Sequence, residues 1–505
     1  MKKKNTKILR KCEGKIARRL RRKGWKAQRK AMLSAKNIHY ELSDKVRGVG
    51  VGGIGAFHLL ATRIGLPKSL DKKLTLLKRH LPYFESDHIL NIAYNILGSG
   101  KSLGDIELLR NDENYLNALD AQRIPDPTTA GDFLRRFEDE DSVGQLMDCI
   151  NECRVKVWKR QKTPSLQQEY GIIDVDGTIA PTTGECKQGM DMSYKGVWAY
   201  SPLILTLANT KEHLYLVNRP GNAVSHKDSV RWMDRAVRLV RKTYRRVCLR
   251  GDTDFALTAQ FDRWTEQGVG FVFGVDAMRN LVEMAEALDE KRYRPLTRQP
   301  KYEVKTSPRK RRENVKEAIV RKRGYENVKL RGESVAEFSY QPTQCQRSYR
   351  MIVLRKNLSV EKGELALFDD VRYFFYIINL PHLSPQQVVR FANQRCNQEN
   401  AIEQLKNGVN ALRMPSDQFY ANWAYMVIAA LAWNMKSWFG LLMQDARRGQ
   451  AVVRMEFRRF VNLFIHLPCQ ILRTGRQILF RILTYHAWLK DFLNTFLRIK
   501  ATTFG

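Results

Sequence analysis

The stretch from 170 to 275 constrains the fold of this chain more than any other. Its apolar runs predict five strands, at 170–176, 198–209, 213–220, 245–252 and 269–276. Amphipathic stretches between the last three predict a helix before the fourth strand and another before the fifth. The order β-β-β-α-β-α-β predicts an α/β fold with a mixed sheet that begins as a three-stranded meander.

Acidic residues end two of these strands. In YGIIDVDGTIAP, period-two alternation places Ile173 and Val175 on one face and Asp174 and Asp176 on the other. Asp252 ends the fourth strand, in CLRGDTDF. Carboxylates at the carboxyl ends of strands are typical of metal-binding or phosphate chemistry. Either Asp174 or Asp176 could be the carboxylate that the first strand contributes to such a site. Asp176 is favoured because it lies nearer the end of the strand.

A third acid lies far along the chain, in the predicted helix RCNQENAIEQLKNG. Arg395, Glu399 and Lys406 form R-x3-E-x6-K, and at 3.6 residues per turn they lie roughly on one stripe. Alone, such a pattern usually marks a surface ion pair. With Asp176 and Asp252 at strand ends, it instead indicates three carboxylates that hold two divalent cations for phosphodiester chemistry. Mg²⁺ suits such oxygen ligands.

The charge of the chain favours a polyanionic partner. Lys plus Arg number 87 and Asp plus Glu 52, which gives a formal charge of +35. That excess disfavours an ordinary metabolic enzyme and favours nucleic acid or an anionic membrane surface. The first thirty residues contain one acid, Glu13, and read either as a solvated tail or as a DNA-contacting arm. The arm is favoured, and its candidate DNA-binding residues are Arg18, Arg19, Arg21, Arg22 and Lys23.

Compartment and membrane association follow from weaker signals. The eight cysteines form no C-x-x-C pair, and no secretory signal precedes the chain, so a reducing cytoplasm is expected. The apolar run 419–439 is long enough to be considered a membrane span. Asn422, Asn434 and Lys436 interrupt it, which favours a buried core helix and no membrane partner.

Taken together, these motifs resemble the DDE transposases of bacterial insertion sequences, of the group 1 type. The likeness rests on the three-stranded start, the two strand-end aspartates, R-x3-E-x6-K and a strand-rich stretch before the glutamate. The runs IPDPTTAGDFLRRF, SPLILTLANT and RPGNAVSHKDS are also similar to this family, so the resemblance covers most of residues 120–440. It implies an RNase H-like catalytic core interrupted by a β-rich insertion.

The resemblance also implies an activity. Such proteins bind terminal inverted repeats in double-stranded DNA, cut there with Mg²⁺ (two ions, for which Mn²⁺ can substitute) and join the ends to target DNA. By position, Asp176, Asp252 and Glu399 match the acidic triad. Arg395 and Lys406 match helix residues that contact DNA near the cut. A homodimer or higher multimer on DNA, in a bacterial cytoplasm and associated with the nucleoid, is implied as well.

One departure from the family pattern concerns base stacking. Members often carry Tyr three positions before the helix arginine, where this chain has Ala392, with Phe391 beside it. A role that requires a tyrosine to stack on a flipped base is therefore in doubt.

The expected organisation has six parts. They are a basic N-terminal arm (1–50), a helical DNA-binding domain (51–165), the first part of the RNase H-like core (166–275), a β-rich insertion (276–370), the second part of the core (371–440) and a helical C-terminal region (441–505).

Two other functions compete with the transposase. DVDGT resembles the first motif of haloacid dehalogenase-type phosphatases, with Asp174 as nucleophile and Asp176 as acid-base residue. That fold needs a βα crossover after the motif, whereas two strands are predicted here. The second competitor is a catalytically inactive nucleic-acid-binding relative, which would satisfy the charge without cutting DNA. Metal dependence separates it from an active transposase.

Overall fold

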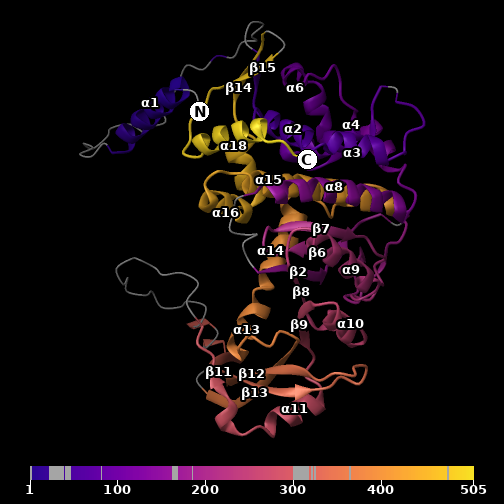
Figure 1. Ribbon diagram of the computed structural model, residues 1–505, viewed down its shortest axis with the longest axis vertical. Helices are drawn as coiled ribbons and strands as arrows, with labels where there is room; N and C mark the ends of the chain where they lie inside the picture. Colours follow the sequence, from indigo (N-terminus) through magenta and orange to yellow (C-terminus); the bar gives the residue numbers. More distant parts are fainter. Residues whose placement is uncertain are drawn as a thin grey trace.

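The protein is elongated, with most helices at one end and a group of long strands at the other (Figure 1). The computed structural model describes residues 3–21, 39, 47–80, 82–161, 169–184, 186–298, 318–319, 322–323, 326–362, 365–474 and 477–504. The first helix, α1 (Lys3–Leu20), and the last, α18 (Leu489–Ala501), both lie at the helical end.

A nine-stranded mixed sheet, ordered β10-β11-β12-β13-β9-β8-β2-β6-β7, forms the frame of the molecule. The strands are β2 (Tyr170–Gly177), β6 (Leu203–Leu207), β7 (Glu212–Val217), β8 (Arg246–Gly251), β9 (Val269–Val275), β10 (Arg294–Pro295), β11 (Glu326–Tyr340), β12 (Tyr349–Lys362) and β13 (Leu365–Ile378). β8 is parallel to both β2 and β9, and β6 is antiparallel to β2 and β7. The order β7-β6-β2-β8-β9, in which β6 alone runs against the others, is an RNase H-like core. The predicted fold class is confirmed.

The predicted strand at 198–209 is interrupted. It forms β5 (Trp198–Tyr200) and β6, separated at Ser201-Pro202, because a proline has no N–H to donate to a strand ladder. β5 joins β3 (Ala180–Pro181) and β4 (Asp191–Met192) in a small separate sheet. This small sheet directly follows β2 in the chain and ends where β6 begins.

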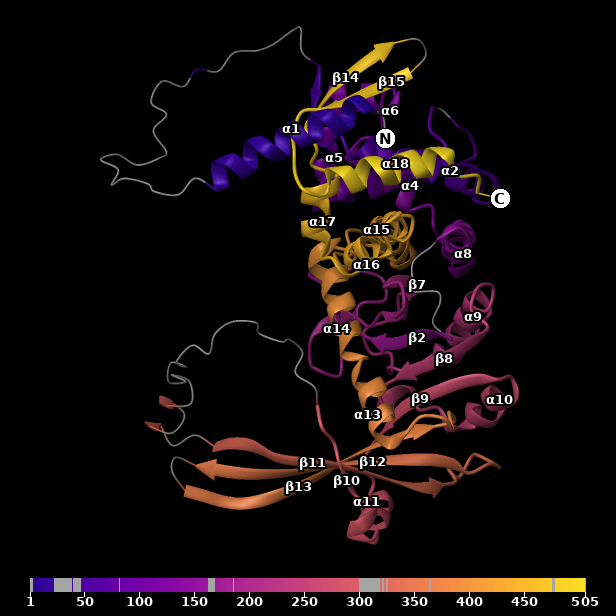
Figure 2. The ribbon, with the colours of Figure 1, turned by 60° about the vertical axis from the view of Figure 1, so that its left-hand side comes forward.

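Helices cover both faces of the core sheet (Figure 2). On one face lie α9 (Ser229–Val240) and α10 (Phe261–Glu266), and on the other α13 (Pro385–Asn393) and α14 (Cys396–Glu403). α14 continues into one π-helical turn, Gln404–Gly408. The late helix expected to be continuous is therefore broken at Gln394–Arg395 and widened at its end.

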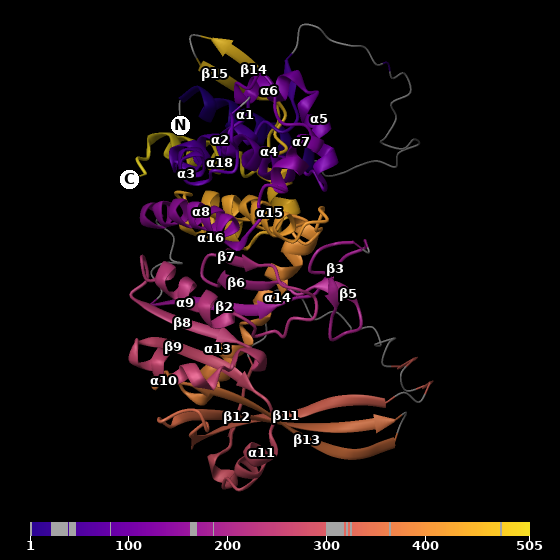
Figure 3. The same ribbon diagram turned by 90° about the vertical axis from the view of Figure 1, so that its right-hand side faces the viewer.

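The stretch 276–370 extends the core sheet. After α11 (Arg279–Glu286), β11, β12 and β13 form long antiparallel hairpins, and the end of β13 pairs with β9 through Phe375↔Val275 to Ile378↔Val272. Figure 3 shows these strands projecting beyond the rest of the sheet. The residues expected as an insertion are thus hydrogen-bonded to the core as further strands.

A helical layer separates the sheet from the N-terminal helices. Its centre is α15 (Phe419–Leu441), which is buried from Ala421 onward. It packs against β7 and against α4 (Glu85–Leu97), α8 (Glu140–Arg160) and α16 (Ala446–Arg454). In the part of the chain that the structure describes, no helix is long and apolar enough to cross a membrane. Polar groups in α15 have internal partners. Lys436, for example, donates to the carbonyls of Val452, Val453 and Met455 at the end of α16.

The remaining elements build the helical end. They are β1 (Gly48–Val49), α2 (Ile54–Arg63), α3 (Leu66–Lys73), α4 (Glu85–Leu97), α5 (Ile106–Arg110), α6 (Glu113–Leu119), α7 (Pro127–Leu134), α8 (Glu140–Arg160), α16 (Ala446–Arg454), α17 (Phe457–Phe464), β14 (Cys469–Thr474) and β15 (Gln477–Ile482). Residues 441–505 were expected to be helical, but β14 and β15 form a hairpin that pairs with β1. The first and last parts of the chain therefore fold together.

Candidate active site

Two of the predicted carboxylates converge on one arginine. Asp176 lies near the end of β2 and Asp252 directly follows the adjacent parallel strand β8, so both side chains lie at the same edge of the sheet. Arg395, between α13 and α14, places Nη1 3.1 Å from Oδ2 of Asp176 and 3.6 Å from Oδ2 of Asp252. A single cationic group therefore bridges the ends of two neighbouring strands.

Asp174 has a different partner. Arg250, its register partner on β8, donates from Nε to Oδ1 at 2.6 Å and from Nη2 to Oδ2 at 2.9 Å. Both side chains are 2% exposed. Arg250 also donates to the Phe391 carbonyl and lies under the Phe391 ring. This bidentate pair occupies both oxygens of Asp174, whereas Asp176, near the strand end, shares the single guanidinium of Arg395 with Asp252.

The third predicted carboxylate, Glu399, is exposed on α14. The negative charge of Glu399 is nevertheless close enough to Asp176 to add to the rise in the pKa of that carboxyl, which burial mainly causes. Lys406 lies seven residues on, within the π-helical turn, and is half-buried. The wider turn changes the angle between Glu399 and Lys406, so the regular stripe expected from 3.6 residues per turn is not kept.

The electrostatics of the pair favour a bound cation. Burial raises the pKa of the Asp176 carboxyl to about 7; the charges of Asp252 and Glu399 add to this rise, and Arg395 opposes it. Burial also raises the pKa of Asp252, again opposed by Arg395. Two partly desolvated carboxylates repel each other, and a positive charge between them relieves this repulsion.

The residues present fit a divalent cation in part. Among the described residues, no three His, Cys, Asp or Glu side chains are grouped closely enough to hold a metal. Asp176 and Asp252 nevertheless supply oxygen ligands of the kind that Mg²⁺ prefers. The buried Oδ1 of Asp252 has no hydrogen-bond partner among those residues, which leaves an acceptor for a ligand. The exposed carboxylate of Glu399 would have to turn inward to join them.

The predicted DNA-binding arm is described only in part. Helix α1 is a basic helix on which Arg18 is exposed, with its Nε bonded to the Gly14 carbonyl, and Arg21 follows, also exposed. Arg22, Lys23 and the side chain of Arg19 lie outside the described residues.

The structure also identifies residues that the sequence pattern did not single out for this site. Arg250 is one, since its pairing with Asp174 depends on the parallel register of β2 and β8. A second group lies on the β4–β5 hairpin, where Tyr194 is 82% and Trp198 53% exposed. Burial lowers the pKa of Lys406, and the charge of Lys195, beside Tyr194, lowers it further, against Glu403. The exposure of these aromatic side chains could not be deduced from their spacing.

Comparison with known proteins decides the family. The family model described as transposase DDE domain group 1 matches residues 48–503. The chain belongs to this family. No curated protein matches this DDE-domain transposase. A cryo-EM structure of the piggyBac transposase synaptic complex with hairpin DNA matches 81% of each chain at 11% identity. Its TM-score is 0.34, a likeness too low to carry an argument.

The topology also disfavours the phosphatase. A haloacid dehalogenase-type site needs a helical crossover after its first strand, but β2 is followed in the transposase sheet by antiparallel β6. In addition, the residue that would be the phosphatase nucleophile, Asp174, is held in the ion pair with Arg250.

Proposed function

We propose that this transposase cuts DNA at the terminal inverted repeats of an insertion sequence and joins the ends to target DNA. Asp176, Asp252 and Glu399 would be its catalytic carboxylates. The observation that carries this proposal is the convergence of Asp176 and Asp252 on Arg395 at adjacent strand ends. Asp174 would act as a positioning residue, because its bond to Arg250 fixes β2 against β8.

The charged side chains have separate tasks in this proposal. Asp176 and Asp252, joined by Glu399, would hold Mg²⁺ or Mn²⁺ ions, which when bound supply charge stabilisation and activate a water or a 3′-hydroxyl. Arg395 neutralises the aspartates in the free protein and would turn to a DNA phosphate when cations bind. Lys406 would contact the backbone near the cut. Joining two ends requires two sites held together, which a multimer on DNA would provide.

The test uses DNA that carries the gene with its native flanks. Purified protein is incubated with it in Mg²⁺, and breaks are mapped to the nucleotide. We expect paired breaks at inverted repeats, absent in EDTA and in Glu399→Gln. Glu403→Gln, on the same helix and also exposed, is the matched control and should cut normally.

A different pattern would overturn the proposal. Salt-sensitive binding with no metal-dependent break, under conditions in which the protein is folded, would identify a non-catalytic DNA-binding relative instead. Equal cutting by wild type and Glu399→Gln would remove Glu399 from the triad.

A further inference from the structure

A cavity of about 500 Å³ lies on the face of β2 that carries the aspartates. Ile172, two residues before Asp174 on that face, and Arg250 line it, so the Asp174–Arg250 pair stands between this cavity and the site at Asp176. Residues of α14 and the π-helical turn, including Asn400 and Gln404, form another wall. Its volume is within the range of small-ligand sites, roughly 300–1,000 Å³.

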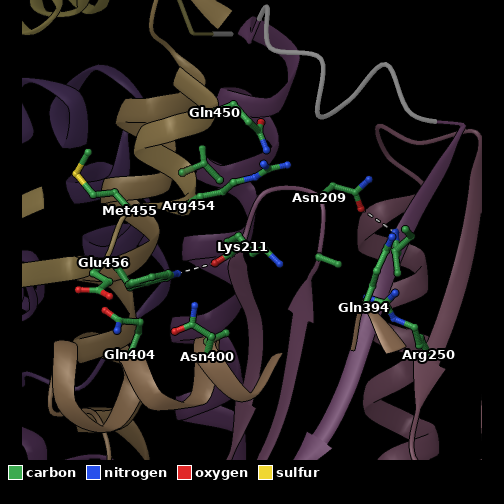
Figure 4. Close-up of a pocket in the computed structure, with 15 residues that line it drawn as sticks. Asn209, Lys211, Arg250, Gln394, Asn400, Gln404, Gln450, Arg454, Met455 and Glu456 are labelled. Carbon is green, nitrogen blue, oxygen red and sulfur yellow. Dashed lines mark hydrogen bonds between the residues drawn. The ribbon is translucent and has the colours of Figure 1, made fainter. Parts of the chain in front are cut away.

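Cationic side chains enter the cavity from two further elements. Lys211 comes from the β6–β7 turn and Arg454 from the end of α16, and Figure 4 shows both extending into the same space. In the described part of the chain, neither lies within ion-pair distance of a carboxylate. The third cation, Arg250, is already neutralised by Asp174. Glu456 is the one acid lining the cavity.

The surroundings of Lys211 lower its pKa. Burial lowers the pKa of Lys211, and the charges of Arg250 and Arg454 lower it further, against Asp174. Most other polar groups on the walls are carboxamides, including Asn400 and Gln404. The Oε1 of Gln404 accepts from the Phe457 amide, which leaves its N–H₂ group to donate. A concave site with two cations outside ion-pair distance of any described carboxylate, and with amide donors, has the chemistry of a phosphate site.

We propose that this cavity binds a phosphate of a DNA strand between Lys211 and Arg454. That the phosphate belongs to DNA rests on the proposed function, whereas the binding of a phosphate rests on the side chains that line the cavity. Asn400 directly follows Glu399, so a strand that crosses α14 from the candidate active site reaches the cavity. Bound there, the strand would be held on both sides of α14, at a contact that needs no metal ion.

Binding in EDTA tests this inference apart from cleavage. The affinity of the full chain for a single-stranded thymidine octamer is measured by fluorescence anisotropy across a salt series. We expect Lys211→Gln and Arg454→Gln each to weaken binding about fivefold or more and to reduce the salt slope by about one. Arg447→Gln, on α16 but outside the cavity, is the control and should change affinity less than twofold. Wild-type affinity in both cavity variants would overturn the proposal.

Two further arms separate the sources of phosphate. Inorganic phosphate and thymidine monophosphate are titrated against the same variants by thermal shift. If inorganic phosphate or thymidine monophosphate binds tightly, and Lys211→Gln abolishes that binding without changing octamer affinity, the assignment to DNA is wrong. Weak binding of both, with octamer binding lost, supports it.

A measurement on the wild-type protein avoids any folding defect of the variants. Its lysines are acylated at neutral pH and mapped by mass spectrometry with and without the octamer. We expect the octamer to protect Lys211, and equal labelling would overturn the proposal. If the octamer protects Lys211 but the protein never cuts DNA, this inference stands and the proposed function fails. If the protein cuts normally and Lys211 is not protected, the proposed function stands and this inference fails.

Discussion

At the scale of single residues, two aspartates on one face of one strand have different environments. Asp174 is buried and fully paired, whereas Asp176 shares Arg395 with Asp252. The two-residue spacing gives them a common face but not a common environment. Asp174 has an arginine of its own, whereas Asp176 shares its arginine with a second carboxylate.

Removal of the buried partner should destabilise the protein. In Asp174→Asn, Arg250 keeps its charge at a site that is 2% exposed, and breaking such a buried pair costs about 3–5 kcal/mol. Urea denaturation in EDTA measures the loss, and Asp176→Asn is the matched control, expected to unfold at a urea concentration no lower than wild type. Equal destabilisation by the two substitutions would contradict the distinction drawn between them.

The pH dependence of stability should identify Asp176. Its folded pKa of about 7 lies above the unfolded value, near 3.9, so the folded protein binds more protons between these limits. The contribution of Asp176 to the free energy of unfolding is therefore largest at low pH and falls as pH rises from about 4 to about 7. We expect Asp176→Asn to be more stable than wild type at pH 8 and this advantage to shrink at pH 5 and vanish below about pH 4, by urea denaturation in EDTA. An advantage independent of pH would contradict the raised pKa.

At the scale of elements, what the sequence predicts depends on how local the cause is. The strands that carry Asp176 and Asp252 follow from alternation and strand-end position, and the family motif adds Glu399. The pairing of β13 with β9 and the register that brings Arg250 to Asp174 join segments that are far apart in the chain. The break in the late helix and the β14–β15 hairpin also lack a local pattern. These features are decided by packing between elements, which periodicity does not report.

Glu212 illustrates such packing, because it joins three elements. Its carboxylate, at the start of β7, accepts from Arg154 and Trp158 of α8 and from Trp438 of α15. Glu212→Gln should lower the free energy of unfolding by about 3–5 kcal/mol, since Arg154 is buried and would lose its only ion-pair partner among the described residues. Glu152→Gln, which removes an exposed partner of Lys73, should cost about 1 kcal/mol or less in the same urea experiment. Similar losses in both variants would contradict this account.

The β4–β5 hairpin should contribute to DNA binding through stacking. Ser193 fixes its turn through bonds with Val197, and the turn presents Tyr194 and Trp198 to solvent. Aromatic stacking on an unpaired base contributes about 1–3 kcal/mol. Trp198→Ala should therefore weaken binding of a DNA end with a single-stranded overhang about fivefold or more, measured by anisotropy in EDTA. Trp198→Phe should retain most of the affinity, and Phe374→Ala, exposed on β13, should have no effect. Unchanged binding by Trp198→Ala would exclude stacking.

At the scale of the whole molecule, a small acidic site lies within a strongly basic protein. The formal charge of +35 attracts DNA wherever basic side chains are exposed, while Asp176 and Asp252 repel phosphate at the place where cutting is proposed. The basic surface and the acidic pair therefore act on DNA in opposite directions. Binding should follow the total charge, and metal ions should matter only at the pair.

This opposition gives a prediction for Asp252→Asn. In EDTA the variant lacks one repulsive charge beside the DNA backbone, so it should bind a duplex of the element end more tightly than wild type. In Mg²⁺ the order should reverse, because the cations that compensate Asp252 would lose a ligand. Both proteins should lose about 10³-fold or more in affinity between 50 and 200 mM salt, as expected for six or more phosphate contacts. Anisotropy titrations at each salt concentration, with and without Mg²⁺, provide the comparison. Weaker binding by the variant in EDTA would show that Asp252 supports DNA binding by itself, and the metal-binding role proposed for it would then lose its electrostatic basis.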